Sequence, residues 1–188
     1  MEQFGKLPGI GARTAERLAF HILKASKDEA MALARAIHDV KTKIQPCERC
    51  FNLTEAQVCN ICADPRRNQS VICVVEQPKD LLTIEATGVY GGVYHVLMGQ
   101  IAPLDGVAPE DLTIDALVER VKSGTVSEVI LATNPTVAGD GTALHITALI
   151  EPLGVKITRL ARGLPSGGQI EYANKSILSD AINERREV

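Results

Sequence analysis

The sequence predicts a multidomain fold, α+β and α/β, with four successive parts: a helical N-terminus, a small four-cysteine segment, a parallel α/β domain and a C-terminal strand/helix segment. Three observations support this expectation. Apolar residues recur at helical spacing through the first 46 residues, two Cys-x-x-Cys pairs follow, and from residue 70 short apolar runs alternate with amphipathic stretches. A chain of 188 residues is long enough for several small domains of this kind.

The first part, residues 1–46, is expected to be helical. Apolar residues fall on one face of a helix over 12–24, and again over 28–44. Asp28 and Glu29 lie where acidic side chains favour the start of a helix. Two such helices bury little surface by themselves, so the sequence predicts that another domain or chain covers them.

Two closely spaced cysteine pairs dominate the second part, residues 47–69. Cys47 and Cys50 form one Cys-x-x-Cys pair, and Cys59 and Cys62 form another after a gap of eight residues. This spacing is typical of a closed, tetrahedral zinc site with four thiolate ligands, which would stabilise a segment too short to build a core. Disulfides suit a cytosolic chain poorly, and thioredoxin-like redox sites use a single pair. We therefore expect one structural zinc (Zn) per chain.

The third part, residues 70–161, alternates predicted strands and helices, as parallel α/β sheets do. Apolar runs predict strands at 70–76, 94–98, 128–133 and 155–161. Helical stretches lie between them, at 80–88, 111–124 and 140–154. Cys73 falls inside the first strand and is expected to be a buried apolar residue, not a fifth zinc ligand. Functional residues of such sheets gather at the carboxyl ends of the strands.

A glycine-rich turn precedes the first long helix. The run LPGIG at residues 7–11 resembles the helix-hairpin-helix motif, whose core pattern is hydrophobic-x-Gly-hydrophobic-Gly. Gly9 and Gly11 allow a tight turn and let backbone N–H groups approach a phosphate, to which the helix adds its positive dipole end. Arg13 and Arg17 lie one turn apart and could reach neighbouring phosphates. The alternative is an ordinary turn with the arginines on a solvated surface.

Three acidic residues follow predicted strands. Glu76 ends the first strand, Asp80 comes four residues later, and Asp140 begins the helix after the third strand. The arrangement resembles the Toprim domain of topoisomerases, primases and recombination proteins, in which a Glu and an Asp-x-Asp pair can hold Mg²⁺ beside DNA. Ala138 stands where the other acid of that pair is expected, so any Mg²⁺ site would be weak. The alternative is that Asp140 only caps its helix and Asp80 lies in an exposed loop.

Charge and composition narrow the classes of function. Residues 1–50 carry nine Lys/Arg against six Asp/Glu, whereas residues 51–188 carry eleven against seventeen. This distribution suggests a nucleic-acid-binding N-terminus. The 3% aromatic content, with no Trp, argues against the stacking platform that OB-folds offer to single strands. No apolar run is long enough to cross a bilayer and no signal peptide is visible, so we expect a cytoplasmic protein without membrane contact.

These features, in this order, resemble one family, the RecR recombination mediators. The resemblance is carried by LPGIG, RLAFH, CERCFNLTE, CNIC, DPRR, LATNPT and LGVKITRLARGLP. It implies a ring-shaped homotetramer that binds DNA, and residues 162–188 are expected in its subunit contacts. Because the hairpin would contact the DNA backbone and not the bases, we expect binding without sequence preference. The resemblance also implies the partners RecO and RecF, with which RecR proteins help load RecA onto single-stranded DNA during recombinational repair.

The same resemblance assigns roles to particular residues. Arg13 and Arg17 match the DNA-contacting basic positions of the family. Glu76, Asp80 and Asp140 match its acidic Toprim cluster, which in the family is implicated in partner binding more than in catalysis. We therefore expect these three acids to dock a basic partner such as RecO.

Some positions depart from the family pattern. Ala138 replaces an acid, Gln169 stands where an acid is common, and family members usually have a longer first helix. The sequence thus predicts a non-enzymatic DNA-binding mediator. The alternative is a Mg²⁺-dependent Toprim nuclease or primase-like enzyme, which a carboxylate at position 138 would favour. A sequence-specific zinc-finger regulator is disfavoured because the cysteine segment carries no basic recognition helix.

Overall fold

A computed structural model of the chain describes residues 1–185. The chain divides into two compact units, one spanning Met1–Gln45 and the other beginning at Pro46. Residues 186–188, the end of the expected C-terminal segment, lie outside the described residues.

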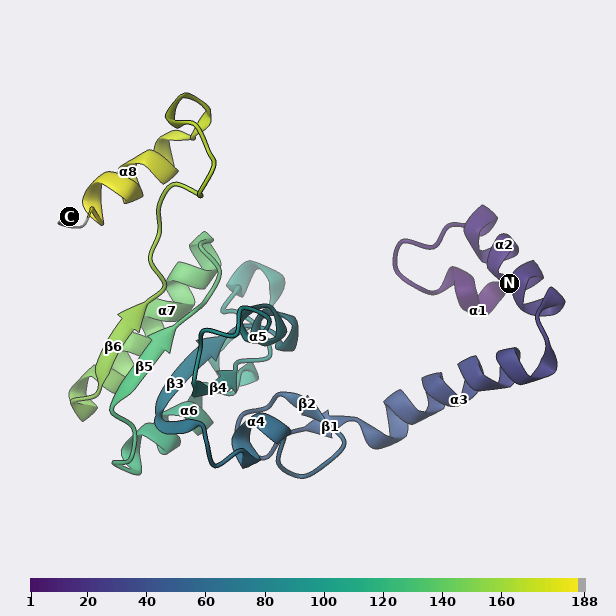
Figure 1. Cartoon of the computed structure of the whole chain (residues 1–188), viewed down its shortest axis with the longest axis horizontal. Helices are drawn as coiled ribbons and strands as arrows, with labels where there is room; N and C mark the ends of the chain where they lie inside the picture. Colours follow the sequence, from purple (N-terminus) through teal and green to yellow (C-terminus); the bar gives the residue numbers. More distant parts are fainter. Residues whose placement is uncertain (186–188) are drawn as a thin grey trace. The chain divides into compact units, whose positions relative to one another are not determined.

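The N-terminal unit is helical, as expected. It consists of α1 (Glu2–Gly5), α2 (Ala12–Lys24) and α3 (Lys27–Lys43) (Figure 1). Ser26 begins α3 with a capping box: its hydroxyl accepts the Glu29 N–H at 3.2 Å, and the Glu29 carboxylate accepts the Ser26 N–H at 2.9 Å. This box satisfies backbone groups that the first turn of a helix leaves without partners.

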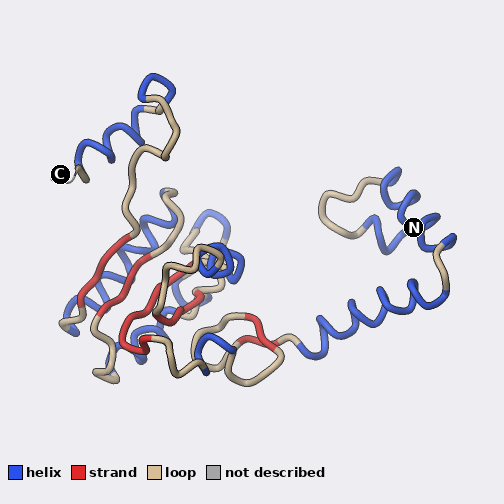
Figure 2. Tube along the Cα trace, in the orientation of Figure 1, coloured by secondary structure: helices blue, strands red, loops and turns tan. Residues whose placement is uncertain are grey.

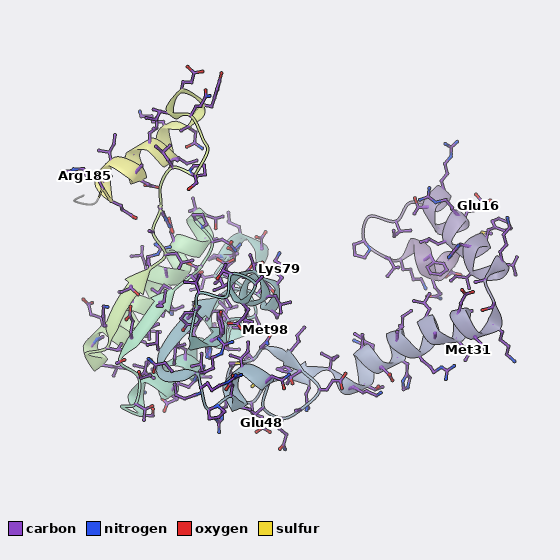
Figure 3. The ribbon with its side chains drawn as sticks, in the orientation of Figure 1. Glu16, Met31, Glu48, Lys79, Met98 and Arg185 are labelled. Carbon is purple, nitrogen blue, oxygen red and sulfur yellow. The ribbon has the colours of Figure 1, made fainter. Side chains whose placement is uncertain are left out.

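This unit has almost no core. Ala15 is the only fully buried residue between positions 1 and 45. Several apolar side chains of α2 and α3 are exposed instead, among them Leu23, Ile37 and Val40. Met31, labelled in Figure 3, is another exposed apolar side chain of α3. Because burial of apolar surface is the main stabilising contribution to a fold, this unit derives little stability from its own contacts.

The second unit is built on a parallel sheet. Its strands are β3 (Asn68–Val75), β4 (Gly92–Val96), β5 (Glu128–Leu131) and β6 (Lys156–Arg159), in the order β4-β3-β5-β6 (Figure 2). Each neighbouring pair is parallel. The four strands and the parallel α/β class agree with the expectation from the sequence.

Alternate residues of β3 face opposite sides of the sheet. Ile72 and Val74 pack with residues of α6 (Ile114–Lys122) and α7 (Val137–Ile150) in the larger apolar cluster. Cys73 and Val75 pack on the other side with Leu81 of α5 (Pro78–Glu85). Cys73 is buried, as expected, within this second cluster.

The four-cysteine segment packs on the same side of the sheet as α5. It contains the short strand β2 (Leu53–Thr54) and the single turn α4 (Asn60–Ala63), and β2 pairs with the short strand β1 (Gln45–Pro46) just before the segment. Phe51 and Ile61 of this segment pack against the cluster around Cys73. The Val96 N–H donates to the Cys50 carbonyl at 2.8 Å, which fixes the segment to the edge strand β4.

A C-terminal arm follows β6. It contains the 3₁₀ turn η4 (Ile170–Tyr172) and helix α8 (Lys175–Asn183), which Asn174 caps by accepting the Ile177 N–H at 2.9 Å. The Arg162 N–H donates to the Glu184 carboxylate at 2.9 Å, so the end of the described arm returns to its beginning. Three further 3₁₀ turns connect elements of the sheet domain: η1 (Pro103–Asp105), η2 (Pro109–Asp111) and η3 (Glu151–Leu153).

Candidate metal centre and nucleic-acid interface

The four cysteines of the predicted zinc site come together in the structure. Their sulfur atoms all lie within 4.8 Å of one another, and all four residues are buried. Ligand sulfurs around a tetrahedral zinc, each about 2.3 Å from the ion, are roughly 3.8 Å apart. All five cysteines of the chain are free thiols. The cysteine group therefore fits one structural zinc ion.

Backbone geometry around the first pair orients the ligands. Phe51 has a positive φ of 62°, which turns the chain sharply after Cys50. This turn lets the Phe51 N–H donate to the Cys47 carbonyl at 2.9 Å, while the Cys59 N–H donates to the Cys47 sulfur at 3.2 Å. Hydrogen bonds from the thiols of Cys50 and Cys62 lower the pKa of Cys59, and the same contact with Cys59 raises the pKa of Cys50. A zinc ion bound here would cross-link two short turns that have no core of their own.

The predicted hairpin lies between α1 and α2. Gly9 has a φ of +77°, a left-handed conformation that L side chains rarely adopt, and the Ile10 N–H donates to the Leu7 carbonyl at 3.1 Å to close the turn. Gly11 occupies the N-cap of α2, and a Cβ there would meet no atom within 4 Å. No side chain caps α2, so its first N–H groups face an open approach.

The two predicted arginines lie on α2 just beyond this turn. Arg13 and Arg17 are exposed and border a shallow hollow of about 530 Å³ with Phe20, His21 and Lys24. Among residues 1–185, no carboxylate lies within 4.0 Å of either guanidinium group. Glu16, labelled in Figure 3, contributes one acidic group to the same hollow. The interface is therefore a predominantly basic face with two unpaired arginines.

Lys24 is a member of this face that the sequence interpretation missed. It follows Arg17 by seven residues, which is two helical turns, so it belongs to the same side of α2. The helical period was the signal that could have found it.

Glu76 forms an internal contact at the end of β3. The residue is 5% exposed, and its carboxylate accepts hydrogen bonds from the Asn134 backbone N–H at 2.8 Å and from the Asn134 side-chain amide at 2.5 Å. The contact joins the end of β3 to the loop that follows β5. Gly139 lies against this contact, because a Cβ there would be 2.7 Å from Glu76 Oε1 and 2.2 Å from the Asn134 carbonyl oxygen.

The other two acids are also engaged. Asp80 lies in the first turn of α5, where its carboxylate accepts the Gln77 N–H at 2.9 Å, and not in an exposed loop. Asp140 pairs with Arg162 and, at 2.8 Å, with Arg159, and these guanidinium groups hold its pKa below the usual value. The N-cap of α7 is Thr136, whose hydroxyl accepts the Gly139 N–H at 3.0 Å.

The three acids follow parallel strands, yet they do not form a metal-binding group. Within residues 1–185, the four cysteines are the only His, Cys, Asp or Glu residues that gather in a group of three or more at ligand distance. A hollow of about 750 Å³ does lie at the carboxyl edge of the sheet, where Glu76 shares its lining with Asp105 and Asp111. Lys79 and Met98, labelled in Figure 3, line the same hollow.

No helix in residues 1–185 has both the length and the apolar character needed to span a membrane.

Family models match three successive stretches of the chain. Residues 1–41 match the model of the RecR helix-hairpin-helix, and residues 44–64 match the model of the RecR zinc finger domain with four cysteines. Residues 70–161 match the Toprim domain. These stretches contain, in order, the glycine turn with its arginines, the four cysteines and the parallel sheet.

Curated relatives match over almost the whole chain. Recombination protein RecR of Rhodopirellula baltica is 56% identical over 186 residues, which cover 99% of this chain and 94% of the relative. The corresponding protein of Rubrobacter xylanophilus is 55% identical with the same coverage, and that of Chloroflexus aggregans is 54% identical over 100% of this chain and 92% of the relative. At this identity and coverage, together with the zinc-binding cysteine group and the helix-hairpin-helix turn, the chain belongs to the RecR family of recombination proteins.

Proposed function

We propose that this RecR protein binds DNA without sequence preference through its helix-hairpin-helix turn. The observation that carries the proposal is the unpaired basic face of α2, formed by Arg13, Arg17 and Lys24 beside a helix N-terminus without a side-chain cap. Free N–H groups at a helix N-terminus and exposed guanidinium groups both suit phosphate oxygens. Contacts of this kind bind the nucleic-acid backbone and not base edges, so affinity depends on salt and not on sequence.

Fluorescence anisotropy with labelled DNA over a range of salt concentrations tests this proposal. The double variant Arg13→Ala with Arg17→Ala should bind all sequences more weakly, and its salt dependence should be shallower by about 1.8 in log Kd against log salt. The matched control is Arg66→Ala with Lys122→Ala, which removes two exposed charges that pair with Asp64 and Glu119. An unchanged slope in the α2 variant would place DNA elsewhere on the protein.

The chain is further proposed to assemble as a homotetrameric ring, with residues 162–188 in the subunit contacts. The exposed apolar side chains of α3 support self-association, because Ile37 and Val40 are each 59% exposed and lie on one face of the helix. Light scattering should give the mass of four chains for the wild type. Ile37→Glu with Val40→Glu should lower that mass, whereas Arg35→Glu, on the opposite face of α3, should not. A monomeric wild type would contradict the proposal.

We propose that the chain is a recombination mediator, which acts with RecO and RecF to help load RecA onto single-stranded DNA. Of the three acids expected to dock a basic partner, Glu76, Asp80 and Asp140, the partly exposed Asp80 and Asp140 would form the docking edge, because Glu76 is buried in its contact with Asn134. The acidic lining of the 750 Å³ hollow at the same edge of the sheet supports this placement, since negative potential steers a positively charged surface.

The docking test spares Glu76, because its carboxylate joins β3 to the loop after β5. Asp80→Asn with Asp140→Asn removes two charges and retains an oxygen that can accept the Gln77 N–H. This variant should bind RecO more weakly at low salt while keeping its fold and its affinity for DNA. Mg²⁺-dependent cleavage or polymerisation by the wild type that disappears in the variant would instead favour the Toprim nuclease or primase-like alternative.

A further inference from the structure

A guanidinium group lies between α6 and the sheet without a carboxylate beside it. Arg120, near the end of α6, is largely buried and donates through Nη1 to the Tyr94 carbonyl at 2.8 Å and to His95 Nδ1 at 3.2 Å. Among residues 1–185, no carboxylate lies within 4.0 Å of it. A cation in such a position requires negative charge nearby, since burial without a partner is costly.

His95 does not provide that charge. Its Nδ1 accepts from Arg120, which has only donors, so the ring proton is on Nε2, which donates to the Thr113 carbonyl at 2.9 Å. Burial lowers the pKa of His95 to about 3, and the ring is therefore neutral at neutral pH. The side chain positions the guanidinium group but carries no charge.

The four-cysteine segment lies next to Arg120 and His95. The ring of Phe51 contacts the ring of His95 edge to face, with 5.3 Å between the centroids, and the Cys50 carbonyl accepts from β4 at Val96. Arg120 and Cys62 line one hollow of about 720 Å³ between α6 and the cysteine segment. Glu48, labelled in Figure 3, also lines this hollow, and it is an exposed residue.

Burial lowers the pKa of Arg120, whereas negative charge on Cys62, Cys50 and Cys47 raises it. Cys62 lines the same hollow as Arg120, and it is buried, whereas the two carboxylates of that hollow, Glu48 and Glu119, are exposed. The buried negative groups on this side of the guanidinium group are therefore the zinc ligands. Arg49, an exposed residue of the cysteine segment, is a cation that acts against them.

We propose that Arg120 is the buried counter-charge of the zinc centre and couples that centre to the α/β domain. A zinc ion with four thiolates carries roughly two net negative charges. These charges are buried here with the cysteines, and the N–H group that reaches the Cys47 sulfur offsets only part of them. A fixed guanidinium group on α6 then stabilises the loaded centre, as partners outside the ligand set of metal sites commonly do.

The proposal makes the affinity for zinc depend on a residue that contacts no metal. In Arg120→Gln, the dissociation constant for zinc, measured by competition with a colorimetric chelator on the full chain, should rise about tenfold or more. Arg120→Lys retains the charge and should stay within about threefold of the wild type. Lys122→Met, two residues along α6, removes an exposed cation that pairs with Glu119 and should leave the constant unchanged.

Thermal unfolding of zinc-loaded and chelated protein separates this role from simple packing. Without zinc, the cysteines are largely neutral thiols and offer Arg120 little negative charge. Arg120→Gln should therefore lower the thermal unfolding midpoint of the zinc-loaded protein. The difference between the midpoints of the zinc-loaded and chelated forms should become smaller than in the wild type.

Equal losses in both forms, with zinc affinity unchanged, would show that Arg120 only supports packing and would overturn the proposal. If Arg120→Gln does not fold, Arg120→Met and Arg120→Lys give the same comparison of lost and retained charge. Equal zinc affinities in those two variants would overturn the proposal as well.

Discussion

Two stretches of this chain lack a core of their own, and they differ in how their surfaces are covered. Residues 1–45 form three helices with one fully buried residue, whereas the four-cysteine segment buries all four of its cysteines. The cysteine segment also packs on the sheet through Phe51 and Ile61, and Val96 donates to its backbone. Within the N-terminal unit, Ile37 and Val40 of α3 have no comparable cover.

The difference teaches where each stretch obtains its stability. The cysteine segment is stabilised by a metal site and by a neighbouring domain, both within one chain. The N-terminal unit has local devices, such as the Ser26 capping box, and an apolar surface that suits contact with a second chain. Substitutions in the second unit should therefore affect folding, and those in the first should affect assembly and local fraying.

The largest expected effect is at the zinc ligands. Cys59→Ser should reduce bound zinc to well below one equivalent per chain and lower the unfolding midpoint by at least about 10 °C, because ligation stabilises a segment that has no core. Elemental analysis and calorimetry measure the two quantities. Cys73→Ala is the matched control: this cysteine is buried in the sheet and lies outside the ligand group, so zinc should remain at one equivalent. Full zinc content in Cys59→Ser would contradict the four-ligand site.

The next largest effect tests whether the second unit is tightly packed, in contrast to the first unit, which has almost no core. In Gly139→Ala, the new Cβ would lie 2.2 Å from the Asn134 carbonyl oxygen and 2.7 Å from Glu76 Oε1, so unfolding free energy should fall by about 1–3 kcal/mol. Gly141→Ala, two residues along α7, meets no atom within 4 Å and should be neutral or stabilising by up to about 1 kcal/mol. Urea unfolding followed by circular dichroism measures both. Equal effects in the two variants would show that the Glu76–Asn134 contact is not a tight one.

Periodicity located most elements, and capping decided where they begin. The apolar pattern of 12–24 predicted α2 with its observed bounds, because the residues that show the helical spacing extend over the whole helix. The helix expected at 140–154 begins earlier, at Val137, because the Thr136 hydroxyl accepts the Gly139 N–H. Val137, Ala138 and Gly139 show no amphipathic pattern, so periodicity alone could not include them.

The sequence predicted the candidate site residues whose partners are close in the chain, but not the contacts that join distant residues. The cysteine group followed from spacing, because both pairs lie within one short segment. The surroundings of Asp140 did not, because Arg159 and Arg162 reach it from the end of β6 and the arm that follows. Arg120 belongs to no motif, and its position beside the cysteine segment depends on the packing of α6.

A smaller effect is expected at the start of α3. Ser26→Ala removes the hydroxyl that accepts the Glu29 N–H, which should cost about 1 kcal/mol of helix stability. Amide hydrogen exchange at residues 27–31 should accelerate about fivefold, while exchange in the sheet should not change, because α3 and the sheet belong to different compact units. Glu29→Gln retains the capping-box pattern and is the control. Faster amide exchange in β3 as well would show that the stability of the sheet depends on α3.

The smallest expected effect concerns Asp140, at the surface of the second unit. Its side chain is 37% exposed, so solvent screens its pairs with Arg159 and Arg162, and Asp140→Asn should cost under about 1 kcal/mol at neutral pH. The arginines lower the pKa of Asp140 below the usual 3.8, so the folded state favours the charged carboxylate. This contribution is present above that pH and is lost as pH falls through the folded-state value. Wild type and Asp140→Asn should therefore differ slightly at pH 7 in urea unfolding and converge once the pH falls below the folded-state pKa of Asp140. Glu110→Gln, which removes an exposed acid, should show no such convergence. A difference that persists after the carboxylate is protonated would mean that Asp140 contributes through packing, as Gly139 does beside the Glu76 contact, and not through its charge.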